Sequence, residues 1–469
     1  MSGSSRSAEP PEGSTSTPHP PVSDPSVVSL IHLGCARNLI DSELILGRLS
    51  EEGLMVSGEL EGAGTVVINT CSFIGPARAE SEAAICEQLE RKAAGEIERV
   101  VVAGCLVQRY RRSLVESFPA VDLFAEISDY RGLASAIADM SAGRAAPAYL
   151  EAGGLRAPAR DAARLLSTPR SYAYLRISHG CDHECSFCTI PSIRGPHRSK
   201  RLVDLVSEAE ELVSAGVREL VLVAEDSTAW GRDMDLELPQ LVEALAETEG
   251  VSRVRVMYAY PNRFPWELAP LLRDHPNVAT YLDIPVQHAA TPILRAMRRA
   301  GSGDVVKRTL ARLQEEVPGI TIRTTLLMGF PGETDADVEE TIHLVREHRL
   351  SRVGAFTFSP EEGTHAATLE DQVPPEVALE RHAAVLEARD AVLGEVQGGR
   401  VGERFDVIVD EGAERTGSAV ARAEWDAPEV DLIACVEAEG LSAGDIVQVE
   451  ATGLDEECNL VCQLVEDST

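Results

Sequence analysis

The sequence predicts an α/β protein in three parts. These are an amino-terminal parallel α/β domain of the flavodoxin-like kind, an open, partial (β/α)6 barrel of the TIM-like kind, and a small carboxyl-terminal β-barrel of the oligonucleotide-binding (OB-like) kind. Two patterns predict this fold class. Apolar, strand-like runs alternate with amphipathic helical stretches as far as residue 396, as in βαβ units around parallel sheets. From about residue 400 the pattern changes to short strands separated by glycine-containing turns.

The composition is that of a soluble protein with an acid excess. A chain of 469 residues suggests roughly three domains, and no apolar run approaches the ~18 residues that span a bilayer. Residues 1–26 are rich in Ser, Pro and Gly and lack the features of a signal peptide, so we expect a disordered tail and a cytoplasmic protein without a membrane partner. The net charge of −33 disfavours nucleic acid as a partner and favours a basic protein.

In the amino-terminal domain, expected over residues 27–140, three cysteines follow strand-like runs at the same relative position. The runs span residues 27–33, 65–69 and 99–103, with helical stretches at 38–52 and 76–92 between them, and they end at Cys35, Cys71 and Cys105. The carboxyl ends of parallel strands share the sheet edge at which such folds bind ligands. We therefore expect the three cysteines to lie along one rim.

After an Ala-, Gly-, Pro- and Arg-rich linker at 141–169, a second domain is expected over residues 170–398. Its strand-like runs lie at residues 172–178, 220–223, 253–259, 281–285, 321–327 and 353–358, with helical stretches between them, for example at 203–214, 239–247 and 335–348. Six strand–helix units are typical of an open (β/α) barrel, whose chemistry lies at the carboxyl ends of its strands.

A long helix at 375–396 leads to the third domain, expected over residues 399–469. Its clearest strands are 405–409, 418–423, 432–436 and 446–451. Residues 400–469 hold 4 basic and 18 acidic residues, a net charge of −14. A barrel of this kind that binds RNA would be basic, so the charge indicates a different partner.

The strongest motif is the loop Gly180-Cys181-Asp182-His183-Glu184-Cys185-Ser186-Phe187-Cys188. Three closely spaced thiolates can hold three irons of a [4Fe–4S] cluster, which leaves the fourth iron open for a small molecule such as S-adenosylmethionine. We expect Phe187 to shield the cluster from solvent. The alternative is a zinc knuckle with His183 as the fourth ligand, although such knuckles usually pair two CxxC-like half-sites.

Cys35, Cys71 and Cys105 are a weaker signal, because a buried cysteine is often only a small apolar residue. Their common position after a strand favours a second cluster with an open iron. The other cysteines, Cys86, Cys435, Cys458 and Cys462, are interpreted as packing residues.

Polar and glycine residues after other barrel strands are candidates for contacts to cofactor or substrate. They are Gly329 and Glu333 in Gly329-Phe330-Pro331-Gly332-Glu333-Thr334, Gln287 and His288 after the fourth strand, and Glu225 and Asp226 after the second. The alternative for each is an ordinary hydrogen bond within a loop.

Taken together, these residues resemble the methylthiotransferases, a branch of the radical S-adenosylmethionine enzymes, over almost the whole chain after the tail. The segments that carry the resemblance are Leu33-Gly34-Cys35-Ala36-Arg37-Asn38, Asn69-Thr70-Cys71-Ser72-Phe73-Ile74, Gly104-Cys105-Leu106, Cys181 to Cys188 with Thr189-Ile190-Pro191 and Arg194-Gly195, and, as in a TRAM domain, Asp426-Ala427-Pro428-Glu429-Val430-Asp431. The resemblance implies two [4Fe–4S] clusters, one on each set of three cysteines. It also implies S-adenosylmethionine both as the source of a 5′-deoxyadenosyl radical and as the methyl donor.

Within this family the chain is most similar to the RimO type, on Gln108-Arg109-Tyr110 and on Tyr258-Ala259-Tyr260-Pro261. That type implies methylthiolation of the β-carbon of an aspartate on small-subunit ribosomal protein twelve, with an electron donor such as flavodoxin or ferredoxin. The acidic barrel agrees with a basic ribosomal protein. The alternatives are a methylthiotransferase of transfer-RNA adenosine, with the same six cysteines, and a non-enzymatic iron–sulfur sensor. Glu225 stands where the family more often has glutamine.

Overall fold

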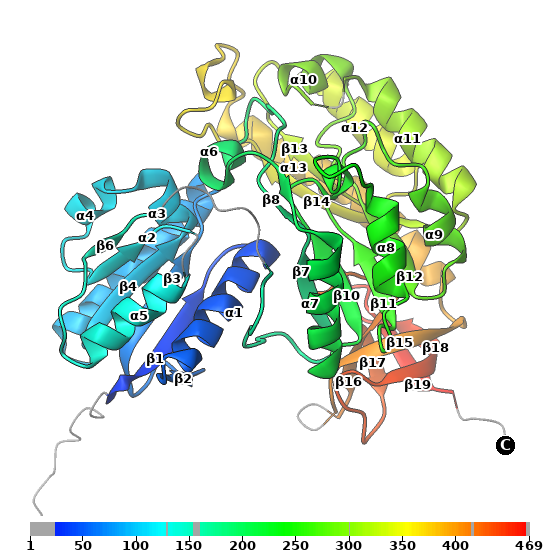
Figure 1. Cartoon of the computed structure of the whole chain (residues 1–469). Helices are drawn as coiled ribbons and strands as arrows, with labels where there is room; N and C mark the ends of the chain where they lie inside the picture. The colour runs from blue at the N-terminus through cyan, green and yellow to red at the C-terminus, as the bar shows by residue number, and fades with distance from the viewer. Residues whose placement is uncertain (1–23, 128–129, 153–159, 300, 414–416, 466–469) are drawn as a thin grey trace, which may run out of the picture.

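Two six-stranded sheets and a closed barrel follow one another along the chain, in a computed structural model that describes residues 24–127, 130–152, 160–299, 301–413 and 417–465. Figure 1 shows the first sheet and its helices on the left, the central sheet on the right and the small barrel below the central sheet. The predicted α/β fold class is confirmed. Residues 1–23, most of the predicted tail, lie outside the described residues.

The first sheet has six parallel strands in the order β2-β1-β3-β4-β5-β6, which contains the flavodoxin-like order. One apolar face is covered by α1 and α5 and the other by α2, α3 and α4, because alternate residues of β3 and β4 point to opposite faces. The strands are β1 (Asp24–His32), β2 (Met55–Ser57), β3 (Ala63–Thr70), β4 (Arg99–Gly104), β5 (Leu123–Ala125) and β6 (Tyr149–Leu150), and the helices are α1 (Ala36–Glu51), α2 (Gly75–Ala93), α3 (Cys105–Tyr110), α4 (Ser113–Ser117) and α5 (Tyr130–Ser141).

The central sheet also has six parallel strands, in the order β14-β13-β12-β11-β10-β7. Among the described residues β7 and β14 do not pair, so the barrel is open, as predicted. Its strands are β7 (Tyr172–Arg176), β10 (Glu219–Val223), β11 (Arg253–Val256), β12 (Val278–Asp283), β13 (Thr321–Met328) and β14 (Arg352–Thr357), and its helices are α7 (Leu202–Ser214), α8 (Leu238–Ala246), α9 (Leu268–Asp274), α10 (Thr291–Ala296), α11 (Gly303–Glu316), α12 (Asp335–Glu347) and α13 (Pro375–Gly399).

Short elements surround the cysteine loop. The hairpin of β8 (Ser178–His179) and β9 (Arg198–Ser199) brackets it, and the helix α6 (Ile190–Arg194) follows its last cysteine. Two 3-10 turns, η1 (Ser227–Ala229) and η2 (Ala366–Thr368), lie in later loops. The backbone N–H of Ala366 donates to the carbonyl of Ser186, which connects η2 to the cysteine loop.

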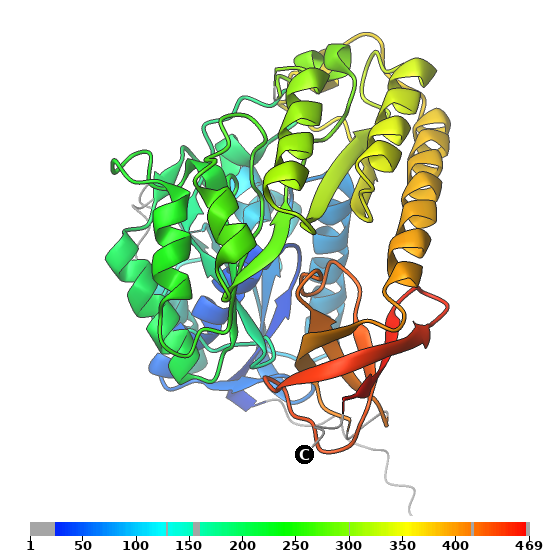
Figure 2. The ribbon, with the colours of Figure 1, turned by 90° about the vertical axis from the view of Figure 1, so that its right-hand side faces the viewer.

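The carboxyl-terminal strands close into a barrel in the order β15-β16-β17-β19-β18. They are β15 (Arg404–Glu411), β16 (Ala419–Ala423), β17 (Ala434–Glu437), β18 (Ile446–Leu454) and β19 (Leu460–Leu464). Figure 2 shows α13 running from the region of the central sheet down to this barrel. Arg422 of β16 pairs with Glu219, at the start of β10, at 2.9 Å, so the barrel packs on the amino-terminal ends of the central strands. The cysteine loop lies at the opposite ends.

The acidic segment at 426–431 takes part in this packing. Asp426 pairs with Arg352 at 2.7 Å and is buried, with 2% of its surface exposed. The hydroxyl of Tyr281 donates to Asp431 at 2.7 Å, and that of Tyr172 donates to Glu429 at 2.9 Å. These carboxylates hold the barrel on the central sheet. The docking of a basic protein on the barrel stays a prediction, and it would involve other acidic residues.

Several predicted boundaries are wrong by a few residues. Residues 24–26, assigned to the tail, belong to β1, and the predicted linker contains β6 as an edge strand. The strand expected at 253–259 ends at Val256, because Tyr258 has a φ of 59° and leaves the extended conformation. Among the described residues no helix is long and apolar enough to cross a membrane.

Candidate functional site

The cysteine loop presents three sulfur atoms, each with one N–H donor. The backbone N–H of His183 donates to Cys181 Sγ at 3.4 Å, and that of Ile190 donates to Cys188 Sγ at 3.4 Å. The guanidinium of Arg299 donates to Cys185 Sγ at 3.6 Å. Donors of this kind stabilise thiolates that hold an iron–sulfur cluster.

The same three cysteines line an open cavity of about 480 Å³. Burial raises the pKa of Cys181 to about 12 and that of Cys188 to about 11, so that these thiols stay protonated until a metal group replaces the proton. The cavity, the three sulfurs and their donors fit a [4Fe–4S] cluster held by three thiolates. Phe187, predicted as a shield, packs against the apolar cluster around Phe330.

The imidazole ring of His183 contacts Asp226 and Tyr260. Its Nε2 donates to the Asp226 carboxylate at 2.7 Å, and its ring stacks on Tyr260 with 3.9 Å between ring centres. Asp226 is fixed in turn by Thr228, whose backbone N–H donates to it at 2.9 Å. Because the His183 ring is engaged by Asp226 and Tyr260, the arrangement disfavours His183 as the fourth ligand of a zinc knuckle.

Cys35, Cys71 and Cys105 lie together at one edge of the first sheet, as predicted. They follow β1, β3 and β4, which are neighbouring parallel strands. Gly34 permits the approach: its φ is 106°, and a Cβ there would lie 2.8 Å from the Cβ and 3.0 Å from the Sγ of Cys71. Any side chain at position 34 would therefore fill the space next to the sulfur.

The three edge thiols differ in their electrostatic surroundings. Burial raises the pKa of Cys105 to about 11 and also raises that of Cys71. Burial alone would raise the pKa of Cys35 too, but Arg37, the backbone N–H of Asn38 and Arg194 together hold it below its usual value. This buried edge with two cations suits thiolates, and so it fits a second cluster.

Arg194 joins the two sets of cysteines. It ends the helix that follows the cysteine loop, yet its Nη2 donates to Cys105 Sγ at 3.3 Å. Its Nη1 donates to Asp41 at 2.8 Å, and Asp41 also accepts from Arg176 of β7 at 2.5 Å. The Arg194 contacts therefore fix the loop against the sheet edge. In the sequence Arg194 was visible only as part of a family segment.

Arg37 lies between the same two sets. Its Nη1 is 3.3 Å from Glu225 and donates to the carbonyl of Ala224 at 3.2 Å, both at the carboxyl end of β10. Its charge lowers the pKa of Cys35 and opposes the larger effect of burial on the pKa of Cys188. One guanidinium is thus within electrostatic range of a thiol from each set.

Glu225 is the acidic partner of Arg37 rather than a free loop residue. Its side chain is 4% exposed, and its Oε2 is buried without a hydrogen-bond partner. A glutamine, the usual family residue, would leave Arg37 without this negative charge.

Glu333 holds the Gly329 loop in place. Its two carboxylate oxygens accept the backbone N–H of Gly329 at 2.9 and 3.0 Å, and Arg381 pairs with it at 3.1 Å. His288 Nε2 lies 3.3 Å away. The buried carboxylate is therefore occupied by protein donors, and the loop that it shapes, at the carboxyl end of β13, remains the candidate surface for a ligand.

Gln287 and Tyr258 share an unusual backbone conformation. Gln287 has a φ of 73° and Tyr258 a φ of 59°, and each follows a central strand at its carboxyl end. Side-chain-bearing residues in this region carry strain that is often kept at functional sites. The backbone N–H of Gln287 donates to the carbonyl of Thr325 at 2.8 Å, which ties the backbone of Gln287 to β13.

Of the four cysteines outside the two sets, Cys86 does not pack in a core, contrary to the prediction. It is exposed on α2, whose buried residues are Ser81, Ile85 and Gln88, and position 86 lies off that stripe. Cys462 is buried in the barrel, whereas Cys435 and Cys458 are partly buried.

Three family models match the chain. The model described as "Uncharacterized protein family UPF0004" matches residues 27–126, "Radical SAM superfamily" matches 175–345, and "TRAM domain" matches 401–465. The first covers the edge cysteines, the second covers the cysteine loop, and the third covers the barrel.

Curated relatives match almost the whole chain. "Ribosomal protein uS12 methylthiotransferase RimO" of Trichlorobacter lovleyi is 39% identical over 443 residues, 94% of this chain and 98% of the relative. The protein of the same name from Porphyromonas gingivalis is 39% identical over 436 residues, 91% of this chain and 96% of the relative. Among solved structures, the radical S-adenosylmethionine methyltransferase TsrM from Kitasatospora setae shares the fold, with a TM-score of 0.52, 17% identity and coverage of 73% of this chain and 77% of that one.

Proposed function

The chain belongs to the RimO family of radical S-adenosylmethionine methylthiotransferases, and from this premise we propose that it transfers a methylthio group to the β-carbon of an aspartate on ribosomal protein uS12. The relatives reported above are named for uS12, which favours this substrate over the alternative, a transfer-RNA adenosine. Family membership makes the chain an enzyme rather than an iron–sulfur sensor.

The proposal assigns two [4Fe–4S] clusters, one to Cys181, Cys185 and Cys188 and one to Cys35, Cys71 and Cys105. When bound, the first cluster supplies the electron that splits S-adenosylmethionine into methionine and a 5′-deoxyadenosyl radical, and the second supplies the sulfur that is methylated and transferred. In this assignment residues 27–140 hold the second cluster, residues 170–398 carry the radical chemistry, and residues 399–469 form the accessory barrel, with 141–169 as their linker.

The protein's own residues hold the two sites in a fixed relation. Arg299 and two backbone N–H groups hold the loop sulfurs, while Arg194 holds an edge sulfur from the helix that follows the loop. The loop of Gly329, shaped by Glu333, and the backbones of Gln287 and Glu225 form the strand ends against which S-adenosylmethionine would lie.

One observation carries the proposal: side chains of single residues span the two cysteine sets. Arg194 follows the loop and bonds to Cys105, and Arg37, two residues after Cys35, pairs with Glu225 at the carboxyl end of β10. A carbon atom that loses hydrogen to a radical formed at one set is then within reach of sulfur held at the other. Methylthio transfer requires this proximity, because the carbon radical is short-lived and has to be trapped at once.

The proposed partners follow from the same chemistry. The substrate is uS12, free or in the ribosome, and the electron comes from a carrier protein such as flavodoxin or ferredoxin, because each cleavage of S-adenosylmethionine consumes one electron. With a cytoplasmic ribosomal substrate, the protein acts in the cytoplasm.

The test is mass spectrometry of two substrates. Protein with reconstituted clusters is incubated without oxygen with reductant, S-adenosylmethionine, and either uS12 or bulk transfer RNA. We expect one methylthio group, replacing one hydrogen, on one aspartate of uS12, and no change when that aspartate is replaced by alanine. Modification of adenosine in transfer RNA alone would move the protein to the RNA-modifying branch.

A further inference from the structure

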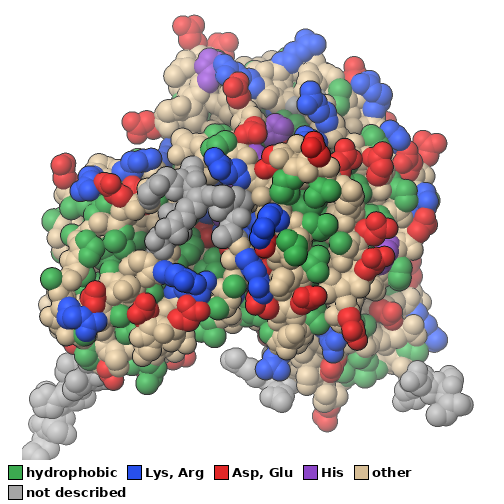
Figure 3. Space-filling model, in the orientation of Figure 1, with side chains coloured by type: hydrophobic (Ala, Val, Ile, Leu, Met, Phe, Trp, Pro, Cys, Tyr) green, Lys and Arg blue, Asp and Glu red, His purple; other side chains and the backbone are tan. Residues whose placement is uncertain are grey.

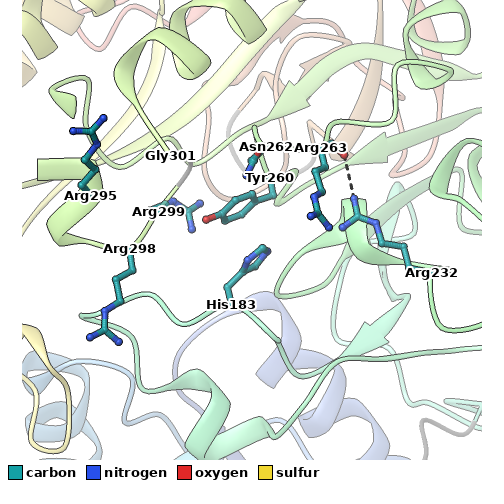
Figure 4. A pocket seen from close by; sticks show the side chains of 9 residues that line it. All are labelled: His183, Arg232, Tyr260, Asn262, Arg263, Arg295, Arg298, Arg299 and Gly301. Atoms are coloured by element: carbon teal, nitrogen blue, oxygen red, sulfur yellow. Dashed lines mark hydrogen bonds between the residues drawn. The ribbon is translucent and has the colours of Figure 1, made fainter. Parts of the chain in front are cut away.

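An arginine-lined pocket of about 480 Å³ lies beside the cysteine loop. Figure 4 shows Arg295, Arg298 and Arg299 on one side of the pocket and Arg232 and Arg263 on the other, with His183 and Tyr260 between them. The arginines come from loops that follow β10, β11 and β12 and from α10, all at the carboxyl ends of the central strands.

Within the described residues these five guanidinium groups have no close acidic partner, although the Asp226 carboxylate lies within electrostatic range of Arg232. Among the described residues, none of the five forms an ion pair with Asp or Glu, although many other arginines of the chain do. The whole chain has a net charge of −33, and on the face drawn in Figure 3 acidic and basic side chains are interspersed. Five unpaired cations in one pocket repel one another, so the pocket favours a bound anionic group.

Two of these arginines have a left-handed backbone conformation. Arg263 has a φ of 58° and Arg298 a φ of 53°, a region that residues other than glycine seldom adopt. Arg232 donates to the carbonyl of Arg263 at 3.1 Å, which fixes the two loops against each other. At Arg298 this conformation ends α10, as is common at helix C-termini, and it turns the chain toward the pocket.

The pocket adjoins the cysteine loop directly. Arg298 and His183 line both the pocket and the cavity of the three loop cysteines. The Arg299 guanidinium is 3.6 Å from Cys185 Sγ and 4.4 Å from the centre of the Tyr260 ring, on which His183 stacks. Planar groups in contact thus lead from the pocket to a sulfur of the loop.

The other flank of the loop is covered by the first sheet. Thr189 donates to the carbonyl of Phe73 at 3.4 Å, and Arg194 reaches Cys105. On another side the loop adjoins the arginine-lined pocket. A basic substrate such as a ribosomal protein would be repelled there, whereas an acidic protein would not.

We infer that this pocket, which we call the arginine pocket, is the docking site of an acidic protein that carries one electron at low potential. The inference rests on the proposed function, in which the loop cluster has to be reduced before each cleavage. Carboxylates of the carrier pair with Arg232, Arg263, Arg295 and Arg298. One electron then passes from the reduced carrier to the loop cluster. The carrier is oxidised by one electron and the cluster is reduced by one electron, and no atom is transferred.

RNA is the other anionic macromolecule that arginines bind. An RNA backbone extends over many phosphates and gains affinity from a basic surface along its path. Beyond the five arginines the surface and the carboxyl-terminal barrel carry the acid excess of the chain. A compact patch of five arginines suits one carboxylate-bearing protein surface better than an extended RNA backbone.

The test compares two triple variants of the full-length holoenzyme. The first, R232E/R263E/R295E, reverses the charge of the arginine pocket without touching Arg299, which bonds to the loop sulfur. The control, R131E/R308E/R346E, makes the same charge change at exposed arginines of α5, α11 and α12. The dissociation constant of a purified bacterial flavodoxin is measured by calorimetry, and the rate of cluster reduction is followed by absorbance with flavodoxin and, separately, with dithionite.

We expect the pocket variant to bind flavodoxin about tenfold or more weakly than the control. The rate of cluster reduction by flavodoxin, divided by the rate with dithionite, should also be lower in the pocket variant than in the control. Equal dissociation constants and equal ratios in the two variants would overturn the inference. Loss of binding to a single-stranded RNA with unchanged flavodoxin binding would also overturn it and assign the pocket to RNA.

Two further measurements keep the outcome interpretable. If thermal unfolding shows that R232E/R263E/R295E is not folded, it is replaced by R232Q/R263Q/R295Q, which removes the charges without reversing them. This variant should also weaken flavodoxin binding. Dithionite-driven methylthiolation of uS12 tests the proposed function separately, since it needs no carrier. Failure of that reaction with intact flavodoxin binding would refute the proposed substrate but not the pocket.

Discussion

The two cysteine sets are built in different ways. The loop set lies between Cys181 and Cys188 in one continuous segment, and backbone N–H groups supply two of its three sulfur donors. The edge set comes from the ends of three strands and depends on the register of β1, β3 and β4 and on the arginines beside it. A loop of this kind needs only local geometry, whereas the edge set exists only when a whole sheet has folded. The two sites should therefore fail in different ways when they are changed.

The largest effect is expected at the loop. Replacing Cys181, Cys185 or Cys188 by alanine removes one of three cluster ligands and should abolish cleavage of S-adenosylmethionine. The measurement is chromatographic detection of 5′-deoxyadenosine from anaerobic, reconstituted protein. Cys86→Ala, at an exposed cysteine of α2 outside both sets, is the control and should cleave at the rate of the unchanged protein. Cleavage at that same rate by any of the loop variants would sink the assignment of the loop.

The edge set should separate the two halves of the reaction. Replacing Cys35, Cys71 or Cys105 by alanine should spare cleavage of S-adenosylmethionine but remove methylthio transfer, because the radical is formed at the loop and the sulfur is held at the edge. Cleavage and the mass of uS12 are measured in the same incubation. Unchanged methylthiolation in these variants would refute the role of the edge and leave the three thiols as packing residues.

The same difference explains what could be predicted from the sequence. The loop set is a contiguous motif, so its residues were identified from spacing alone, and the edge set followed from the position of each cysteine after a strand-like run. The residues that connect the sets were not predictable in that way. The bond from Arg194 to Cys105 and the pair of Arg37 with Glu225 join segments far apart in the chain, and only the packing of the two sheets brings them together.

Local conformation limited the prediction elsewhere. Tyr258 was placed inside a strand because its neighbours are apolar and β-forming, but its positive φ ends the strand at Val256. The two-residue strand β6 has too few residues to leave a pattern and was included in the linker. The arginine pocket was not predicted, because its members lie in three loops with no shared motif.

The smallest of the expected effects concerns Arg194, which follows the loop set in the chain and contacts Cys105 of the edge set. Arg194→Ala removes the donor to Cys105 Sγ and one of the two cationic partners of Asp41. Since Asp41 is buried, the loss of a partner should lower the free energy of unfolding of the apoprotein by about 3 kcal/mol. Urea unfolding measures this change. Arg201→Ala, which breaks an exposed pair with Asp204, is the control and should cost about 1 kcal/mol or less.

In the holoprotein the same substitution distinguishes a positioning role from a merely structural one. Arg194→Ala should slow methylthio transfer about tenfold relative to cleavage, and it should shift the electron paramagnetic resonance signal of the edge cluster while leaving that of the loop cluster in place. Arg194→Lys keeps the charge but cannot reach both acceptors, so it should restore part of the stability and less of the transfer. If both variants slow cleavage and transfer equally, Arg194 supports the fold alone, and the two cysteine sets are coupled only through the packing of their sheets.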